Sequence, residues 1–239
     1  MEEALYSKYG FFNNEKVRSK KSGDFLTSPE VSKYFGKILN HWIQKNNLDL
    51  NIVEFGSGTG SLIEQINTEN KFAVELSSTA RVELSKKNIQ NVASIEDLTF
   101  KESDLVFGNE VLDNIPCSVA VFKDNKWYEK VVNLEDDSFS YDFIHARKEV
   151  IDWIEINQLK GDENIDIEVQ TNIDKFLENI IHNLNPKTIL FFDYGFEQKD
   201  RVKRKYRSLL RTYKDHHLSG DPILEPGNVD ITYDINFSS

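Results

Sequence analysis

The chain has 239 residues, which suits one domain with an elaboration or two small domains. Asp and Glu number 40 against 29 Lys and Arg, giving a net charge of −11 at pH 7. A general nucleic-acid binder needs a basic face to neutralise phosphates, so this balance argues against one. Cys117 is the only cysteine, so no disulfide can form within the chain and a reducing compartment is expected.

The first residues, MEEALYSKYGFF, are acidic and lack both a basic stretch and a long apolar stretch. They resemble neither a secretory signal nor an Arg-rich transit peptide, which favours a cytoplasmic location. The longest apolar runs, such as TILFF, are too short to cross a membrane, so no membrane span is expected. No metal site is predicted.

Helix signals come first along the chain. Ser28 can act as the N-cap with Pro29 in the first turn, and Thr27 with Glu30 has the spacing of a capping box. Apolar residues then recur at helical spacing as far as Ile43. Beyond this helix, strands are predicted at 51–55, 71–76, 91–95, 104–109 and 187–193, and helices near 61–68, 78–88 and 171–184. This alternation predicts an α/β fold with a mostly parallel, Rossmann-like sheet covered on both faces.

The alternation is interrupted after Pro116. Residues 117–145 are rich in β-branched and aromatic side chains, and KDNK has the composition of a hairpin turn. They are predicted to form a small antiparallel insertion, followed by a helix in RKEVIDWIEINQL and a short strand in IDIEVQ. The expected organisation is therefore an N-terminal helical or lid segment at 1–50, a core at 51–116 and 146–239, and a β insertion at 117–145.

The sequence EFGSGTGSL places three glycines directly after the first predicted strand. Gly56, Gly58 and Gly60 alternate with small polar residues, and Glu54 comes two residues before them. In an open parallel sheet, ligands bind outside the carboxyl ends of the strands, and glycines there permit positive φ angles and close approach. One glycine normally suffices for a tight turn, so three favour a ligand loop.

Two cofactor classes use such a loop. A dinucleotide site has the spacing G-x-G-x-x-G/A, whereas here the sixth position is Ser61. Glu54 would also repel a pyrophosphate but would suit the ammonium of a methionine moiety. Glu75, at the end of the next strand, can accept hydrogen bonds from ribose hydroxyls in either class. The spacing therefore favours S-adenosylmethionine over NAD.

The fourth predicted strand also ends in polar groups, in the sequence GNEVLDNIP. Asn109, Glu110 and Asp113 follow an apolar run and should lie at the same edge of the sheet. Carboxylates three residues apart can face the same way and hold a planar guanidinium. The alternative is a helix cap at Asp113 and a solvated acid at Glu110.

Together with GDFLTSPEVSKYFG, VELS, FFDYGF and LLRTYKDHHLSGDPILEPGNVDITYDINF, these stretches occur in an order that covers nearly the whole chain. The sequence resembles the S-adenosylmethionine-dependent methyltransferases that include the mitochondrial complex I assembly arginine methyltransferase and its bacterial relatives. The resemblance implies a class I methyltransferase fold, S-adenosylmethionine as cofactor, and a protein substrate carrying an arginine, with a respiratory-complex subunit as a candidate.

The resemblance also implies roles for particular residues. Glu110 and Asp113 would face the substrate as catalytic residues. The cofactor would be bound by Gly23, Asp24, Thr27, Ser28, Glu54, Gly56, Gly58, Gly60, Glu75 and Asn109. Apart from the resemblance, the proton released on methylation is expected to leave through His216, His217 or water, because histidine side chains titrate near neutral pH.

Two departures from the family pattern lead to further expectations. The family usually has a glycine and a threonine before LRTY, where this chain has Ser208 and Leu209. The family chain also continues beyond DITYDINF, so the C-terminal end of the family fold is expected to be missing. Two alternatives to arginine methylation stay open: methylation of another acceptor, and an assembly chaperone that binds S-adenosylmethionine without turnover.

Overall fold

The structure is a computed structural model, and it describes residues 1–13, 33–163, 165–201, 210–214 and 217–239. The predicted helix start at 27–30 therefore lies outside the described residues. The helix itself, α3 (Lys33–Lys45), is present and shows its apolar side to the core.

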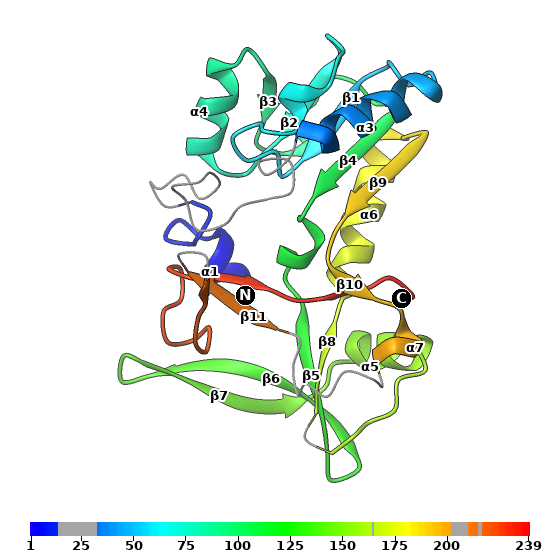
Figure 1. Cartoon of the computed structure of the whole chain (residues 1–239). Helices are drawn as coiled ribbons and strands as arrows, with labels where there is room; N and C mark the ends of the chain where they lie inside the picture. The colour runs from blue at the N-terminus through cyan, green and yellow to red at the C-terminus, as the bar shows by residue number, and fades with distance from the viewer. Residues whose placement is uncertain (14–32, 164, 202–209, 215–216) are drawn as a thin grey trace.

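The centre of the upper part of the molecule is a parallel sheet of five strands in the order β3-β2-β1-β4-β9. All five predicted strands are present, which confirms the predicted Rossmann-like sheet (Figure 1). Their bounds are β1 (Ile52–Phe55), β2 (Lys71–Val74), β3 (Gln90–Val92), β4 (Leu105–Asn109) and β9 (Thr188–Phe192).

Alternating residues of the strands build a separate core on each face of the sheet. Ile52 of β1 and Leu105 of β4 pack with Leu39 and Ile43 of α3. Their neighbours in sequence, such as Val53, turn to the other face, where they meet α6 (Thr171–Leu184). Side chains on a strand alternate between faces, so a sheet with helices on both sides needs this continuous apolar pattern. α4 (Ser78–Lys86) packs beside β2 and β3.

The helix predicted near 61–68 is wrong. Only a short 3₁₀ turn, η1 (Ile63–Gln65), forms there. Side chains take the backbone groups that a longer helix would use: Lys71 Nζ donates to the carbonyl of Ile66 at 2.7 Å, and the N–H of Asn67 donates to Asn40 Oδ1 at 2.8 Å. Helix propagation needs those groups free for bonds four residues apart.

The lower part of the molecule holds an antiparallel sheet in the order β7-β6-β5-β8. Asp124 and Asn125 have φ angles of 49° and 59°, which is the two-residue hairpin turn predicted at KDNK. The strand β8 comes from outside 117–145, and the division of the chain into segments stays a prediction. The bounds are β5 (Ser118–Lys123), β6 (Lys126–Glu135), β7 (Ser138–His145), β8 (Asp166–Val169) and the adjoining helix α5 (Lys148–Ile156).

Short elements from both chain ends lie between the two sheets, where Figure 1 shows α1 beside β11. Leu5 and Phe11 of the N-terminal segment pack against Val229 and Ile231 near the C-terminus. In the parts of the chain described, no helix has the length and apolar character needed to cross a membrane. The remaining elements are α1 (Glu2–Tyr6), η2 (Ile95–Asp97), η3 (Leu112–Asn114), β10 (Gly195–Phe196), α7 (Gln198–Arg201), β11 (Arg211–Lys214), β12 (His217–Leu218), β13 (Asp230–Thr232) and β14 (Ile235–Asn236).

Candidate functional site

A cavity of about 1070 Å³ opens at the carboxyl ends of β1, β2 and β4. Its lining comes from the glycine loop after β1, the end of β2, the loop after β4, and segments near both chain ends. The neighbours β2 and β4 flank β1 in the sheet, so the cavity lies at the place where strand order reverses. Ligands of open parallel sheets bind at such a point.

The three glycines of the loop do different things. All have positive φ angles: 61° at Gly56, 52° at Gly58 and 82° at Gly60. Gly56 and Gly58 line the cavity, whereas Gly60 is not among the residues that line it. A Cβ on Gly60 would come within 2.7 Å of Leu84 Cδ2, so this glycine lets the loop pack against α4. The loop therefore meets the cavity at two of its glycines and the core at the third.

Glu54 is the last but one residue of β1, and its side chain is buried beside the cavity with 3% of the residue exposed. Its Oε2 has no hydrogen-bond partner among the described residues. Burial raises the pKa of the Glu54 carboxyl to about 8, and the nearby Glu75 adds to the effect. A buried carboxylate without a cation is costly, so this position is complementary to a positively charged group.

Glu75 follows β2 and has both carboxylate oxygens held by the backbone. Its Oε2 accepts from the N–H of Gly58 at 2.8 Å, and its Oε1 accepts from the N–H of Ser77 at 2.8 Å. Burial raises the pKa of Glu75, and these two hydrogen bonds oppose the rise. Each oxygen keeps a further lone pair, so the fixed carboxylate can still accept from hydroxyl groups in the cavity.

Asn109, Glu110 and Asp113 lie together at the end of β4, and all three line the cavity. Asn109 Nδ2 donates to Glu110 Oε1 at 3.1 Å. Glu110 has a φ of 54°, a backbone conformation that non-glycine residues adopt at a cost and that is common at functional sites. Asp113 is 7% exposed, and its Oδ1 has no hydrogen-bond partner among the described residues.

Asp193, just after β9, fixes the loop that carries Glu110 and Asp113. Its Oδ2 accepts from the N–H groups of Val111, Leu112 and Asp113 at 3.1, 2.8 and 3.2 Å. Burial raises the pKa of Asp113 well above its usual range, and the charges of Asp193, Asp230 and Glu110 raise it further. Burial also raises the pKa of Asp193 to about 6, against the bonds from the backbone. This end of the cavity is therefore rich in carboxyl groups.

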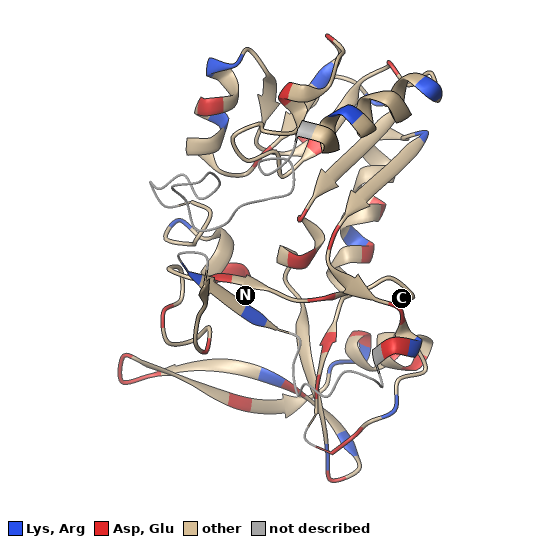
Figure 2. Cartoon of the chain, in the orientation of Figure 1, with Lys and Arg blue, Asp and Glu red and all other residues tan. Residues whose placement is uncertain are grey.

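Two further acids reach the cavity from the C-terminal segment. Asp230 and Asp234 are buried, and Asn114 Nδ2 donates to Asp230 Oδ1 at 3.0 Å. Arg211 of β11 forms an ion pair with Asp234 and is the cationic residue among the described residues that line the cavity. Figure 2 shows acidic residues at the lower ends of β4 and β9 and on the segments below them. The acids that line the cavity are Glu54, Glu75, Glu110, Asp113, Asp230 and Asp234.

Several predicted residues cannot be placed at the cavity. Gly23, Asp24, Thr27 and Ser28 lie outside the described residues, as does His216. His217 is exposed on β12 and is not among the residues that line the cavity.

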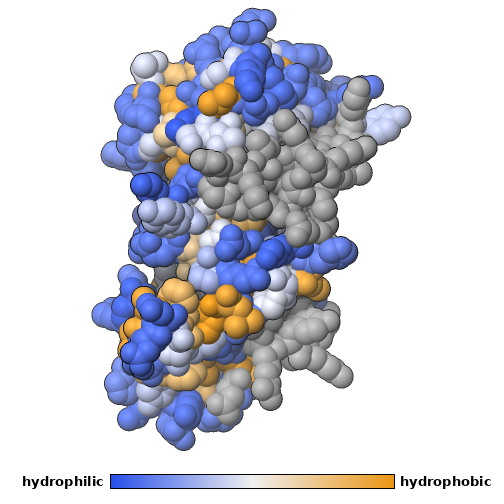
Figure 3. Space-filling view, turned by 90° about the vertical axis from the view of Figure 1, so that its left-hand side faces the viewer, coloured by the Kyte–Doolittle hydropathy of each residue, from blue (hydrophilic) through white to orange (hydrophobic). Residues whose placement is uncertain are grey.

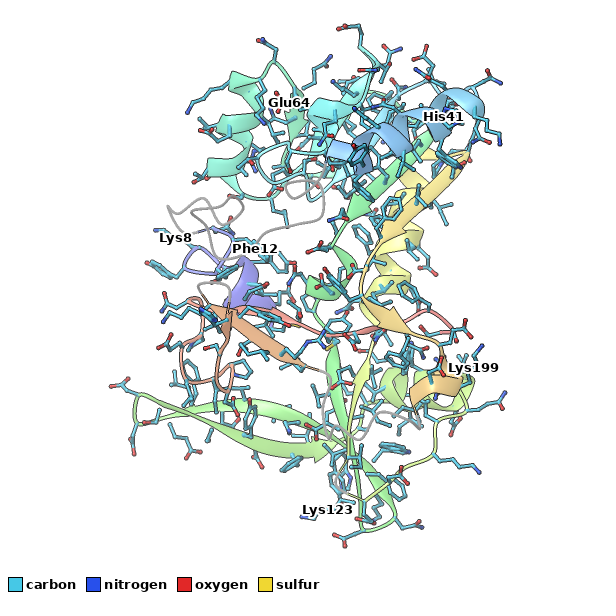
Figure 4. All side chains as sticks on the ribbon, viewed as in Figure 1. Lys8, Phe12, His41, Glu64, Lys123 and Lys199 are labelled. Carbon is cyan, nitrogen blue, oxygen red and sulfur yellow. The ribbon has the colours of Figure 1, made fainter. Side chains whose placement is uncertain are left out.

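Other lining residues were not predicted. Tyr6 lines the cavity and its hydroxyl donates to the carbonyl of Asn114 at 3.0 Å, and Phe12, labelled in Figure 4, also lines it. Neither belongs to a motif, because their position depends on how the N-terminal segment packs. Arg211, Asp230 and Asp234 stand in the LRTY and DITYDINF stretches, which are the only signal that could have identified them.

The fold and the cavity together define a class: a Rossmann-like sheet with a glycine loop and two acids at its carboxyl edge is the class I methyltransferase arrangement. A family model described as "Putative S-adenosyl-L-methionine-dependent methyltransferase" matches residues 34–239. The chain belongs to this family. The family's dependence on S-adenosylmethionine confirms the cofactor predicted from the glycine loop.

Solved structures support the fold. A Burkholderia thailandensis protein bound to S-adenosyl-homocysteine superimposes with a TM-score of 0.85 and 22% identity, over 99% of this chain and 67% of that one. A second crystal structure from the same organism gives a TM-score of 0.79 and 24% identity, over 99% and 66% of the two chains.

Two curated relatives carry the name "Protein arginine methyltransferase NDUFAF7 homolog, mitochondrial". The Drosophila melanogaster protein is 22% identical over 95% of this chain, and the Caenorhabditis elegans protein is 24% identical over 98% of it. This chain spans only 61% and 63% of the lengths of these two relatives.

Proposed function

We propose that the chain is an S-adenosylmethionine-dependent methyltransferase whose acceptor is the guanidinium of a protein arginine. The observation that carries this proposal is the cavity at the carboxyl edge of the sheet, which is lined by six acids and, among the described residues, by the cation Arg211. Such a lining favours cationic ligands. The relatives named as arginine methyltransferases add support for the choice of acceptor.

The upper half of the cavity fits the cofactor. Glu54 offers a buried carboxylate oxygen that lacks a partner in the described structure, suited to the ammonium of the methionine moiety. Glu75 is held by backbone N–H groups at a position suited to the ribose hydroxyls. Gly56 and Gly58 leave room for close approach to the loop. S-adenosylmethionine, when bound, supplies a methyl group carried on a sulfonium.

The lower half of the cavity fits the acceptor. A guanidinium is planar and pairs with carboxylates through two parallel hydrogen bonds, and Glu110 and Asp113 are two carboxylates on one fixed loop. Arginine is protonated at neutral pH, so its nitrogen is a poor nucleophile until its charge is drawn away from the reacting atom. We assign Glu110 and Asp113 to this orientation and charge localisation.

Methylation of a protonated guanidinium also releases a proton, which must be accepted within the site. Asp113 Oδ1 is buried and without a hydrogen-bond partner in the described structure. Burial, together with the acids around it, raises the pKa of Asp113, which makes its ionised form a better proton acceptor than an exposed aspartate. The proposal therefore gives Asp113 two tasks, holding the guanidinium and taking its proton.

The test uses S-adenosylmethionine with a labelled methyl group and peptides that differ only in carrying arginine or lysine. We expect label on the arginine peptide, with Glu110→Gln and Asp113→Asn lowering kcat/KM by about 100-fold. Glu102→Gln is the matched control, because Glu102 is exposed and precedes β4 at the opposite end of the sheet. Transfer to lysine, or equal losses in the control, would contradict the arginine proposal. Cofactor binding without any transfer would favour an assembly chaperone.

A further inference from the structure

The strand β7 is an edge whose one acidic residue, Asp142, is its main protection against pairing. In the described part of the chain it pairs with β6 alone, at the end of the order β7-β6-β5-β8. All eight of its residues, SFSYDFIH, are exposed, and they include neither proline nor lysine. Natural proteins usually shorten, charge or cover such an edge, because its free backbone groups are a template for another strand.

The direction of these backbone groups follows from the pairing with β6. The N–H of Ala146 donates to the carbonyl of Trp127 at 3.1 Å, directly beyond the pair His145–Tyr128. In an antiparallel ladder the inward-bonded residues alternate, so even-numbered residues of β7 bond to β6 and odd-numbered residues direct their backbone groups outward. The N–H of Phe143 agrees with this, since it donates to Asp142 Oδ1 at 2.8 Å.

The same odd-numbered residues carry large apolar side chains. Phe139, Tyr141 and Phe143 are 44%, 36% and 46% exposed, and Val132 and Leu134, opposite them on β6, are 50% and 61% exposed. Figure 3, which views the molecule from the left-hand side of Figure 1, shows apolar patches on its lower half. The outward backbone groups and the apolar side chains of β7 thus belong to the same residues.

The two ends of β7 carry opposite charges. Glu135 ends β6, Asp136 and Asp137 form the turn before β7, and Arg147 and Lys148 follow it. The side chains of Arg147 and Lys148 are 55% and 87% exposed, although Arg147 also pairs with Glu129 and Glu149 and Lys148 with Asp152 of the same chain. If a second copy of β7 lies antiparallel beside the first, the basic end of each copy lies beside the acidic turn of the other. The edge is therefore complementary in charge to a second copy of itself.

We propose that β7 pairs with β7 of a second copy of this chain, antiparallel and about a two-fold axis at Tyr141. Phe139 then lies opposite Phe143 of the partner subunit, and the outward backbone groups of both strands are paired. If the register is shifted so that Tyr141 lies opposite Phe143, the two Asp142 carboxylates lie opposite each other. If it is shifted the other way, so that Tyr141 lies opposite Phe139, Asp137 lies opposite Phe143. The register at Tyr141 avoids both, and C2 pairing through one self-complementary surface is the commonest kind of oligomer.

Light scattering on the purified chain across a dilution series tests this pairing. The expected mass at high concentration is about twice the 27.7 kDa of one chain, falling to that value on dilution. Hydrogen exchange over 138–145 is measured on the same samples and should slow at high concentration, since pairing protects the outward N–H groups. One mass of a single chain throughout, with unchanged exchange in this strand, would overturn the proposal.

Variants test the register. Phe139→Lys should weaken association by about tenfold or more, since it removes an apolar pair twice in each dimer. Adding Phe143→Glu to it should restore association, because each lysine then faces a glutamate of the partner. Leu134→Lys is the matched control: it places the same charge on the same face, opposite Phe139 but on β6, which is not the strand proposed to pair with the second copy. Loss of association in this control, or no rescue in the double variant, would overturn edge pairing in this register.

Discussion

Glu54 carries the strongest single sign of a ligand in this molecule. A carboxylate that is 3% exposed, with one oxygen lacking a partner in the described structure, opposes folding unless something else uses it. Its neighbour in the cavity, Glu75, is by contrast fixed by two backbone N–H groups. Both acids were predicted from their places after two strands, but only the structure separates the fixed acid from the unsatisfied one.

Binding of S-adenosylmethionine should be linked to the proton on Glu54. Burial raises the pKa of this carboxyl to about 8, so at pH 7 it is mostly protonated in the free protein. A cation beside it stabilises the ionised form and lowers its pKa, so binding releases a proton and affinity rises with pH up to about 8. Calorimetry in buffers of different ionisation enthalpy measures the number of protons released for each ligand bound.

Glu54→Gln is the control for this linkage, because the ammonium of the ligand titrates in the same range and contributes proton uptake, opposite in sign to the release from Glu54. The variant should lose the proton release and bind about 10–100-fold more weakly, the effect of removing a charge-assisted hydrogen bond. A proton release that the substitution leaves unchanged would show that Glu54 is not its source.

The glycine motif did not predict the role of Gly60. The spacing predicted three glycines facing a ligand, but the direction in which each Cα faces depends on the path of the loop. Gly60→Ala would place a Cβ 2.7 Å from Leu84 Cδ2, on a residue whose φ is 82°. We expect it to lower the free energy of unfolding by about 1–3 kcal/mol. Gly220→Ala is the comparison, since its Cβ meets Leu224 at an ordinary 3.4 Å. Equal urea midpoints for the two would contradict this assignment.

Among the elements, the strands were predicted well because each is a short apolar run bounded by polar residues. The helix predicted near 61–68 failed for a reason that the local sequence does not contain. Asn40, in α3, bonds to the N–H of Asn67 and so takes part in ending the turn there. Such competition comes from a residue distant in sequence, and periodicity alone cannot reveal it.

Asp193, just after β9, hydrogen-bonds to the loop after β4, and we expect its substitution to affect that loop. Its carboxylate holds three successive N–H groups of that loop, so Asp193→Ala should let Glu110 and Asp113 move from their positions. We expect kcat/KM for the arginine peptide to fall by about 100-fold, since small displacements of positioned groups have effects of that size. Affinity for S-adenosylmethionine should change much less, because Asp193 is not among the residues that line the cavity.

Calorimetry and steady-state kinetics on the same preparation of Asp193→Ala separate these effects. Equal losses in cofactor affinity and in turnover would mean that the substitution disturbs the whole site and that Asp193 does not act on the acceptor end alone.

For the whole molecule, the place of the cavity followed from the sequence, because acids and glycines after neighbouring parallel strands must meet at one edge of the sheet. Its proposed acceptor end followed only in part, through Glu110 and Asp113. Arg211, Asp230 and Asp234 come from the C-terminal segment, and Tyr6 comes from the N-terminal one. These segments meet through packing of Leu5 and Phe11 with Val229 and Ile231, contacts that join the two ends of the chain and leave no local pattern.

We propose the acidic cavity as the site for S-adenosylmethionine. Calorimetry with S-adenosylmethionine, with NAD as the competing ligand, tests it most directly, and Gly58→Val is measured alongside. Gly58 lines the cavity at a φ of 52°, so a β-branched side chain there would strain the loop and fill the site. We expect binding of S-adenosylmethionine, no binding of NAD, and loss of S-adenosylmethionine binding in a folded Gly58→Val variant. Equal affinity for NAD, or full affinity in the folded variant, would contradict the proposal.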